Sequence, residues 1–337
     1  MTTHTLVDIS QARAWLHSLF QEHKEQHPAL KELEKKLMDQ YGAHLFDWTD
    51  HFTIEEGSAE ILEERGFELA FTMPTYRVFK HRQARLPLVL VVEGSTKHPV
   101  GIAMRVDDIS DFLMVQGWEG CVEGSPMSPY RRCLISEKKE SAFFVVERRG
   151  SRSMEPYYAP ESYLDEYFTA KERWQSRLRT EEGEGIQKAL LLAQELVETL
   201  GKERAAWIVL ECEKRYGRFK NPSDSFQNYL GLGRAHMHNY TFRSSRKFFH
   251  FLVQLFEVLG FKRIESFYAG EEQGWGGELL THEVCDGVVR LVVDLDPEEV
   301  YGDKREPLSE KAALGTIGLW CALQGDSILQ SGPYSIE

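Results

Sequence analysis

The sequence predicts an α+β protein built from repeated β-α-β-β-β units with antiparallel sheets and added helical segments. The first observation is that three apolar strands end alike, as LVVE at 90–93, FVVE at 144–147 and LVVD at 291–294. The second is that each of them follows a helix that closes with a glycine and an aromatic residue, and that a strand precedes each helix. Five elements in one order, found three times, indicate an internal repeat far better than a shared tripeptide does.

The units follow one another along the chain. The first starts at HFTIEE (51–56), the second at GIAMRVDD (101–108) and the third at HMHNYTF (236–242). Their helices close at Gly66-Phe67, Gly117-Trp118 and Gly260-Phe261. The middle strands are TYRVFK, RRCLISE and GGELLTHE. Each unit therefore contains all five elements.

Helical segments precede the first unit and separate the second from the third. Residues 9–41 carry two amphipathic helices, the second of which starts at Pro28. Residues 160–220 are helical again, and Gly201 is expected to end one of these helices. The last β-like stretch is LGTIGLWCALQGDSILQ (314–330).

These patterns divide the chain into four parts. The parts are an N-terminal helical segment at 1–45, two βαβββ-like modules at 46–150, a helical insert at 151–232, and a third module with a terminal strand at 233–337. The linker RRGSRSMEPYYAPES (148–162) marks the change from the second module to the insert.

Composition limits the classes of partner. A net charge of −13 over 337 residues argues against nucleic acid, because phosphate backbones bind basic surfaces. We see no apolar run of membrane-spanning length and no signal peptide. The five cysteines are an odd number without a C-x-x-C pair, which is typical of reduced thiols, so a cytoplasmic location is expected.

The order of elements resembles that of the vicinal oxygen chelate superfamily, which includes glyoxalase I, extradiol dioxygenases and bleomycin-resistance proteins. GIAMRVDDISDFL and FFHFLVQLFEVLGF carry the resemblance, which covers 46–150 and 233–300. A generic α+β protein with antiparallel sheets remains the alternative.

The resemblance implies a metal site in a cleft between facing modules, with ligands at the start of the first strand and the end of the fourth strand of each module. The corresponding positions here are His51, Glu93, Gly101, Glu147, His236 or His238, and Asp294. Gly101 has no ligating side chain, so a complete site between the first two modules is not expected. The first and third modules together offer two imidazoles and a carboxylate, the set that leaves open positions on non-haem Fe(II).

The chain is also similar to the 2-oxoadipate dioxygenase/decarboxylase family, a branch of the same fold. The order DHF, helical insert, HMHNYTF and acid matches that family's two histidines and glutamate. Two departures weigh against transferring its activity. Glu55 stands where the family has a substrate-binding arginine, and Asp294 stands where it has a glutamate.

His236 and His238 share one face of the expected strand, because side chains alternate along a strand. One could ligate while the other hydrogen-bonds behind it, and the spacing to Leu-Gly-Phe favours His238. The alternative is two partly solvated histidines on a sheet surface.

The sequence thus predicts a metal-dependent dioxygenase, lyase or isomerase for a small oxygen-rich metabolite. Fe²⁺, Zn²⁺, Mn²⁺ or Ni²⁺ would be held by His51, His238 and Asp294 (or Glu93), with Glu93 or Glu147 as base. The alternative is a non-catalytic small-molecule-binding or regulatory protein of the same fold with a decayed site and no metal. A homodimer is expected, since only GTIGLWCALQG represents a fourth module.

Overall fold

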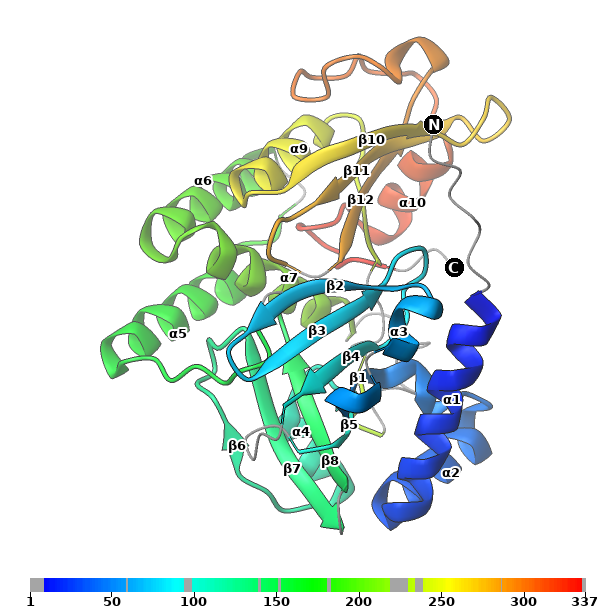
Figure 1. Cartoon of the computed structure of the whole chain (residues 1–337). Helices are drawn as coiled ribbons and strands as arrows, with labels where there is room; N and C mark the ends of the chain where they lie inside the picture. The colour runs from blue at the N-terminus through cyan, green and yellow to red at the C-terminus, as the bar shows by residue number, and fades with distance from the viewer. Residues whose placement is uncertain are drawn as a thin grey trace.

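A computed structural model gives the fold of the chain (Figure 1). It describes residues 9–58, 60–93, 99–138, 141–150, 153–180, 183–218, 230–233, 239–285 and 287–334. An eight-stranded and a four-stranded sheet form the framework; helices cover one face of the larger sheet and lie on both faces of the smaller one.

Each predicted unit is present with its five elements in order. The first comprises β1 (Thr49–Glu55), α3 (Glu60–Glu64), β2 (Phe67–Met73), β3 (Tyr76–His81) and β4 (Leu88–Val92). The second comprises β5 (Gly101–Arg105), α4 (Ile109–Gln116), β6 (Val122–Glu123), β7 (Tyr130–Lys138) and β8 (Ser141–Arg148). The third comprises β9 (Asn239–Arg243), α9 (Phe249–Val258), β10 (Lys262–Tyr268), β11 (Trp275–Thr281) and β12 (Val288–Asp294).

The sheet topology repeats as the elements do. The eight strands run in the order β2-β3-β4-β1-β5-β8-β7-β6, and the four in the order β10-β11-β12-β9. In every unit the first strand lies parallel to the last, as β1 to β4, β5 to β8 and β9 to β12. An antiparallel pairing of β1 with β5 joins the first two units into one sheet. The predicted fold class, an α+β protein of repeated βαβββ units, is confirmed.

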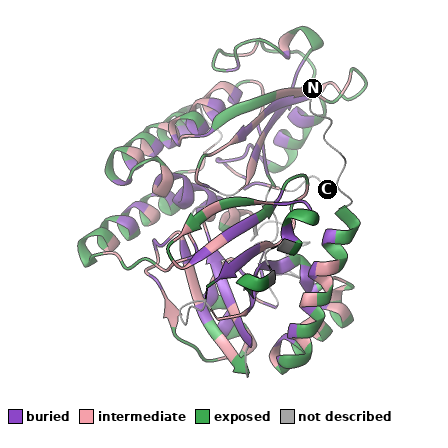
Figure 2. Ribbon diagram, viewed as in Figure 1, coloured by how far each residue is buried: buried purple, intermediate pink, exposed green. Residues whose placement is uncertain are grey.

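The N-terminal helices cover the outer face of the eight-stranded sheet. They are α1 (Ile9–Gln26) and α2 (Pro28–Tyr41), and α2 begins at its proline as predicted. Buried Leu16, Phe20, Leu33 and Leu37 belong to the same apolar cluster as the outward side chains of β1, β5 and β8. These two helices therefore close the core on the outer face of the eight-stranded sheet (Figure 2).

The inner face of this sheet, which bears His51, Tyr76, Leu90 and Val146, holds a smaller core. One member of that core comes from outside the sheet. Met154, in the segment that follows β8, has no exposed surface and packs into the cluster. The segment therefore closes the inner face over part of its area.

The insert contains α5 (Glu161–Ser176), α6 (Gly183–Leu200) and α7 (Lys202–Arg218), which pack with α9 against the third unit (Figure 1). Gly201 separates α6 from α7 with φ 80° and donates its N–H to Val197 O, as expected of a helix stop. Across the described residues, no helix has both the length and the apolar character required to cross a bilayer.

The terminal strand predicted within 314–330 is wrong, because Thr316–Gln324 form a helix, α10. Ile317 and Cys321, one turn apart, pack together on Val292 of β12. A short apolar run has no periodicity that separates a buried helix from a buried strand. The contacts with β12 decide between them.

The chain's own C-terminal residues occupy the outer edge of β9. Thr241 and Tyr334 exchange two backbone hydrogen bonds of 3.0 and 2.9 Å, and Ser327 N donates to Arg243 O at 2.9 Å. In the first two units the corresponding edges pair with each other. The homodimer was expected because a sheet that lacks a module offers an open edge to a neighbour. Here the chain's own C-terminal residues pair with that edge, the one at β9, and the oligomeric state stays a prediction.

Candidate functional site

His51 belongs to a buried charged triad on the inner face. Asp50 lies where the register of β1 against β5 shifts, and its carboxylate is 2.7 Å from His51 Nδ1. Arg148, at the end of β8, donates to the same carboxylate through Nε at 2.7 Å and through Nη2. All three residues are at least nine-tenths buried. The triad therefore joins the first strand of one unit to the last strand of the next.

The charges of the triad fix the tautomer of His51. Burial would raise the pKa of Asp50, but the Arg148 guanidinium outweighs it and holds that pKa below its ordinary value. Burial lowers the pKa of His51, although Asp50 opposes this. An ionised carboxylate only accepts hydrogen bonds, so the neutral imidazole donates from Nδ1. Nε2 therefore carries the lone pair.

Side chains from β3, from β7 and from the linker that follows β8 surround the triad. Tyr130 lies opposite Arg148 in the β7–β8 register, and its ring centroid is 6.2 Å from that of His51. Arg148 also contacts the sulfur of Met154, whose backbone N–H donates to the Tyr76 hydroxyl at 3.2 Å. The linker is thereby fastened beside His51.

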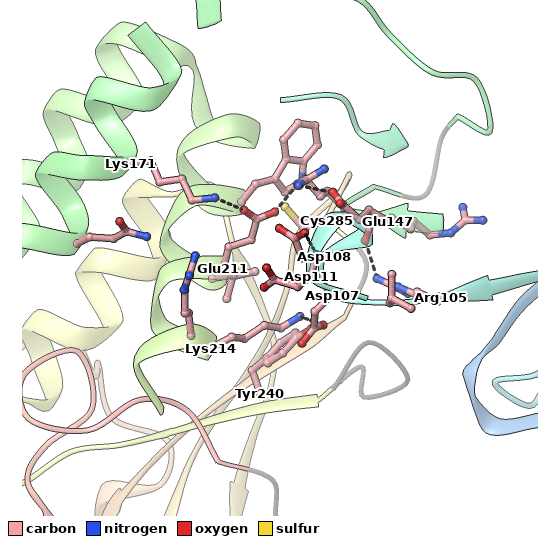
Figure 3. A pocket seen from close by; sticks show the side chains of 17 residues that line it. Arg105, Asp107, Asp108, Asp111, Glu147, Lys171, Glu211, Lys214, Tyr240 and Cys285 are labelled. Atoms are coloured by element: carbon pink, nitrogen blue, oxygen red, sulfur yellow. Dashed lines mark hydrogen bonds and ion pairs between the residues drawn. The ribbon is translucent and has the colours of Figure 1, made fainter. Parts of the chain in front are cut away.

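Next to the triad is a second feature, which we call the charged cavity. It has a volume of about 110 Å³ and lies among the ends of β5 and β8, the start of α4, helices α5 and α7, and β9 (Figure 3). Six basic and five acidic side chains line it, among them Arg105, Asp108, Lys171 and Lys214. The formal charges of the lining are thus nearly balanced, in a chain of net charge −13.

Ion pairs hold most of these charges in place. The Arg149 guanidinium bridges Glu147, at 2.8 Å, and Glu211, which also accepts from Lys171 at 3.3 Å. Burial would lower the pKa of Arg149 and raise that of Glu211, but their mutual attraction reverses both effects. Lys214 lies 3.9 Å from Asp107 (Figure 3). The walls of the cavity are therefore preorganised.

Two groups on the walls are not satisfied in this way. The indole Nε1 of Trp207, a residue only 4% exposed, has no hydrogen-bond partner within the described part of the chain. Burial, together with the charges of Asp108 and Glu147, raises the pKa of Asp111, and Arg215 opposes this only in part. Of these two groups, only the Trp207 N–H is a donor that would gain from a bound oxygen, since Asp111 is an exposed carboxyl group.

The sheet register separates the predicted acids from His51. His51 pairs with Leu88 in β4, so Glu93 points to the opposite face of the sheet. Gly101 pairs with Ala142 in β8, so Glu147 also points to that opposite face. There Glu147 accepts from Ile109 N and Arg131, both at 2.8 Å, and it lines the charged cavity. Glu93 is exposed.

Asp294 lies in the other sheet and holds α10. Its carboxylate accepts the backbone N–H groups of Gly315, Ile317 and Gly318 at 3.0, 2.8 and 2.8 Å. His236 and His238 fall outside the described residues. The remaining, described chain contains no group of three His, Cys, Asp or Glu side chains arranged to hold a metal ion. The described donors by themselves therefore do not fit the implied metal.

Sequence reasoning singled out His51 but not the residues around it. Asp50 is its neighbour in the sequence, and the dipeptide Asp-His was the available signal. Arg148 and Arg149 follow the FVVE strand, where two adjacent arginines marked the strand end. No sequence pattern distinguishes Trp207, because it lies in an amphipathic helix where an aromatic residue is expected to pack in the core.

Comparisons with known proteins give only distant likenesses. No family model and no curated protein matches the sequence. Among solved structures, a candidate hydrolase from Shewanella frigidimarina NCIMB 400 aligns with 46% of this chain and 98% of its own, at 10% identity and a TM-score of 0.32. Glyoxalase I from Zea mays aligns with 73% of this chain and 67% of its own, at 11% identity and a TM-score of 0.23. A mutant of that enzyme covers 75% and 72%, at 12% identity and a TM-score of 0.24. The strand order described above, and not these alignments, defines the fold.

Proposed function

We propose that this chain is a protein of the vicinal oxygen chelate type that binds a small oxygen-rich metabolite in the charged cavity. The single observation that carries the proposal is that Trp207 lines the cavity and that its buried indole N–H has no acceptor among the described residues. Leaving a buried donor unpaired costs about 1–3 kcal/mol, which a ligand oxygen would recover.

The charges and size of the cavity support this ligand class. Its basic side chains supply N–H donors for carboxylate, hydroxyl or phosphate oxygens, and the ion pairs among Glu147, Arg149 and Glu211 keep the walls in position. A volume of about 110 Å³ is of the order that holds a benzene-sized molecule. The ligand is therefore a small metabolite and not a polymer.

A binding screen with a matched pair of variants tests the proposal. The probes are 2-oxoglutarate, malate, citrate and lactate, first by thermal shift and then by calorimetric titration of the whole chain. Trp207→Phe keeps a ring but deletes the N–H, and we expect it to weaken binding about five- to tenfold. Trp320→Phe, on exposed α10 away from the cavity, should bind as the unmutated chain does. Equal binding by Trp207→Phe, or binding of none of the probes, would contradict the proposal.

A metal-dependent dioxygenase or lyase is the second candidate function, and the Asp50–His51 hydrogen bond favours it. A carboxylate that fixes Nδ1–H and leaves the Nε2 lone pair is typical of metal-binding histidines. Further ligands would have to come from His236 or His238. Elemental analysis of the purified protein separates the two candidates. Stoichiometric metal that is lost in both His51→Ala and His238→Ala supports the metal-dependent enzyme. Unmutated protein that contains no metal supports the first candidate, binding without catalysis.

A further inference from the structure

A second cavity lies on the helix-covered side of the third unit, away from the charged cavity. It has a volume of about 440 Å³ between α9 and strands β10 and β11, and residues 301–305 pass along it. Gln254 of α9 holds that segment by donating to Arg305 O at 3.0 Å. None of its lining residues belongs to the site described above.

A buried carboxylate, Glu278, lines this cavity on an otherwise apolar sheet face. Glu278 is 1% exposed, and its register partner in β12 is Leu291. Leu280, two residues along β11, is equally buried on the same face and lines the cavity too. Burying a charged group costs free energy unless a partner compensates it.

The partners of Glu278 compensate its charge only in part. The Ser266 hydroxyl donates to both carboxylate oxygens, at 3.0 and 3.2 Å, but it is neutral. The nearest guanidinium, that of Arg263, is 3.7 Å away, and its side chain is 56% exposed. Burial raises the pKa of Glu278, although the Ser266 hydrogen bond and the charges of Arg263 and Lys304 oppose this. The carboxylate therefore retains capacity for a cation.

The other cations in the lining are held elsewhere. Lys304 is buried, and its Nζ donates to the carbonyls of Val300 and Gly302, at 2.9 and 3.1 Å, and to that of Glu299. Arg305 donates to both carboxylate oxygens of Asp303, at 2.6 to 3.2 Å. Neither is positioned to neutralise Glu278 by a direct bond.

We propose that the second cavity binds a small organic cation, a protonated primary amine with a short alkyl body. Its ammonium donates to Glu278 and supplies the positive charge that the neutral Ser266 hydroxyl lacks. The alkyl part lies against Val253 and Leu280, the apolar members of the lining. Tyr301, 89% exposed, offers an aromatic ring beside the entering cation. Glu278 is thus the counterion of a second ligand.

Titration of the whole chain with n-butylammonium chloride at neutral pH tests the site, with sodium chloride as the blank. We expect saturable binding at concentrations up to about 10 mM. Glu278→Gln keeps the shape and the Ser266 bond but removes the charge, and it should weaken binding at least about tenfold. The matched control is Glu271→Gln, an exposed carboxylate outside the lining of this cavity, and it should change the affinity less than about twofold.

A second variant keeps the test decisive if Glu278→Gln folds poorly. Leu280→Phe narrows the cavity beside Glu278 and leaves the carboxylate in place, so it should also weaken binding. Absence of saturable binding to the unmutated chain would overturn the proposal. An affinity equal to that of the unmutated chain in Glu278→Gln would overturn it as well.

Discussion

Acid should weaken the attachment of the N-terminal helices to the eight-stranded sheet. His27 is fully buried between two hydroxyls, with Nδ1 2.7 Å from Ser136 Oγ and Nε2 2.8 Å from Ser141 Oγ. His23 Nδ1 is 2.8 Å from the same Ser141 Oγ. These hydrogen bonds connect α1 and α2 to β7 and β8, in a place without room for hydrated positive charge.

The size of the effect follows from the pKa of His23. Burial, and then the neighbouring His27, lower this pKa from 6.5 to about 4. The unfolded chain therefore takes up a proton near pH 6.5 and the folded chain only near pH 4, so acidification between these values favours unfolding. At about 1.4 kcal/mol per unit of pKa difference, the folded state loses roughly 3 kcal/mol from His23 alone. Burial lowers the pKa of His27 too, which adds to the loss.

Urea unfolding at about pH 7.5 and about pH 4.5 measures this loss. His23→Gln removes the titrating group, so its stability should fall about 2–3 kcal/mol less than that of the unmutated chain over this range. His44→Gln, at an exposed position just after α2, should behave as the unmutated chain does. If His23→Gln shows the full pH dependence of the unmutated chain, the assignment of the effect to His23 is incorrect.

Three further substitutions test the contacts around the site. Arg148→Met leaves the buried Asp50 carboxylate without its guanidinium and with only the His51 hydrogen bond, so the free energy of unfolding should fall by about 3–5 kcal/mol in urea titrations. A fall below about 1 kcal/mol would show that the ion pair is not essential. Met154→Ala removes a fully buried side chain from the inner face and should cost about 2–5 kcal/mol, whereas an unchanged unfolding midpoint would place Met154 in solvent. Asp294→Ala deprives three amides of α10 of their acceptor, so hydrogen exchange at Ile317 and Gly318 should become faster, and unchanged exchange would contradict the capping role.

The sequence was sufficient to predict the repeated units, because strand and helix periods and closing glycines are local signals. It was insufficient for the terminal helix, since α10 is specified by contacts of Ile317 and Cys321 with β12 and by the Asp294 carboxylate. Those contacts join β12 to a segment more than twenty residues further along the chain, so neither segment alone specifies the helix. Tertiary packing, rather than propensity, decides such short apolar runs.

The acids that end the three apolar strands show why a site is harder to predict than a fold. They align in sequence as Glu93, Glu147 and Asp294, yet the register sets Asp294 apart. Pairing of Val288 with Asn239 and of Ala142 with Gly101 makes Asp294 the counterpart of Arg148, one residue beyond Glu147. A shift of one residue reverses the face on which a strand side chain points.

The charged cavity lay beyond sequence reasoning for a different reason. Its walls come from the second unit, the insert and β9, so no single segment carries its pattern. Glu147 was singled out as a base, and the structure places it in an ion pair with Arg149. Only the structure distinguishes Trp207, because its N–H is buried without an acceptor among the described residues.

The indole N–H resonance of Trp207 gives the most direct test of the central claim. Labelling with ¹⁵N-tryptophan yields indole signals from the seven tryptophans, and Trp207→Phe identifies the relevant one by its disappearance. When the best of the oxo-acid and hydroxy-acid probes is added, the account predicts that the Trp207 proton moves downfield as its N–H gains an oxygen acceptor, while the Trp320 signal stays in place. A probe that binds the protein and leaves the Trp207 signal unmoved would contradict the account.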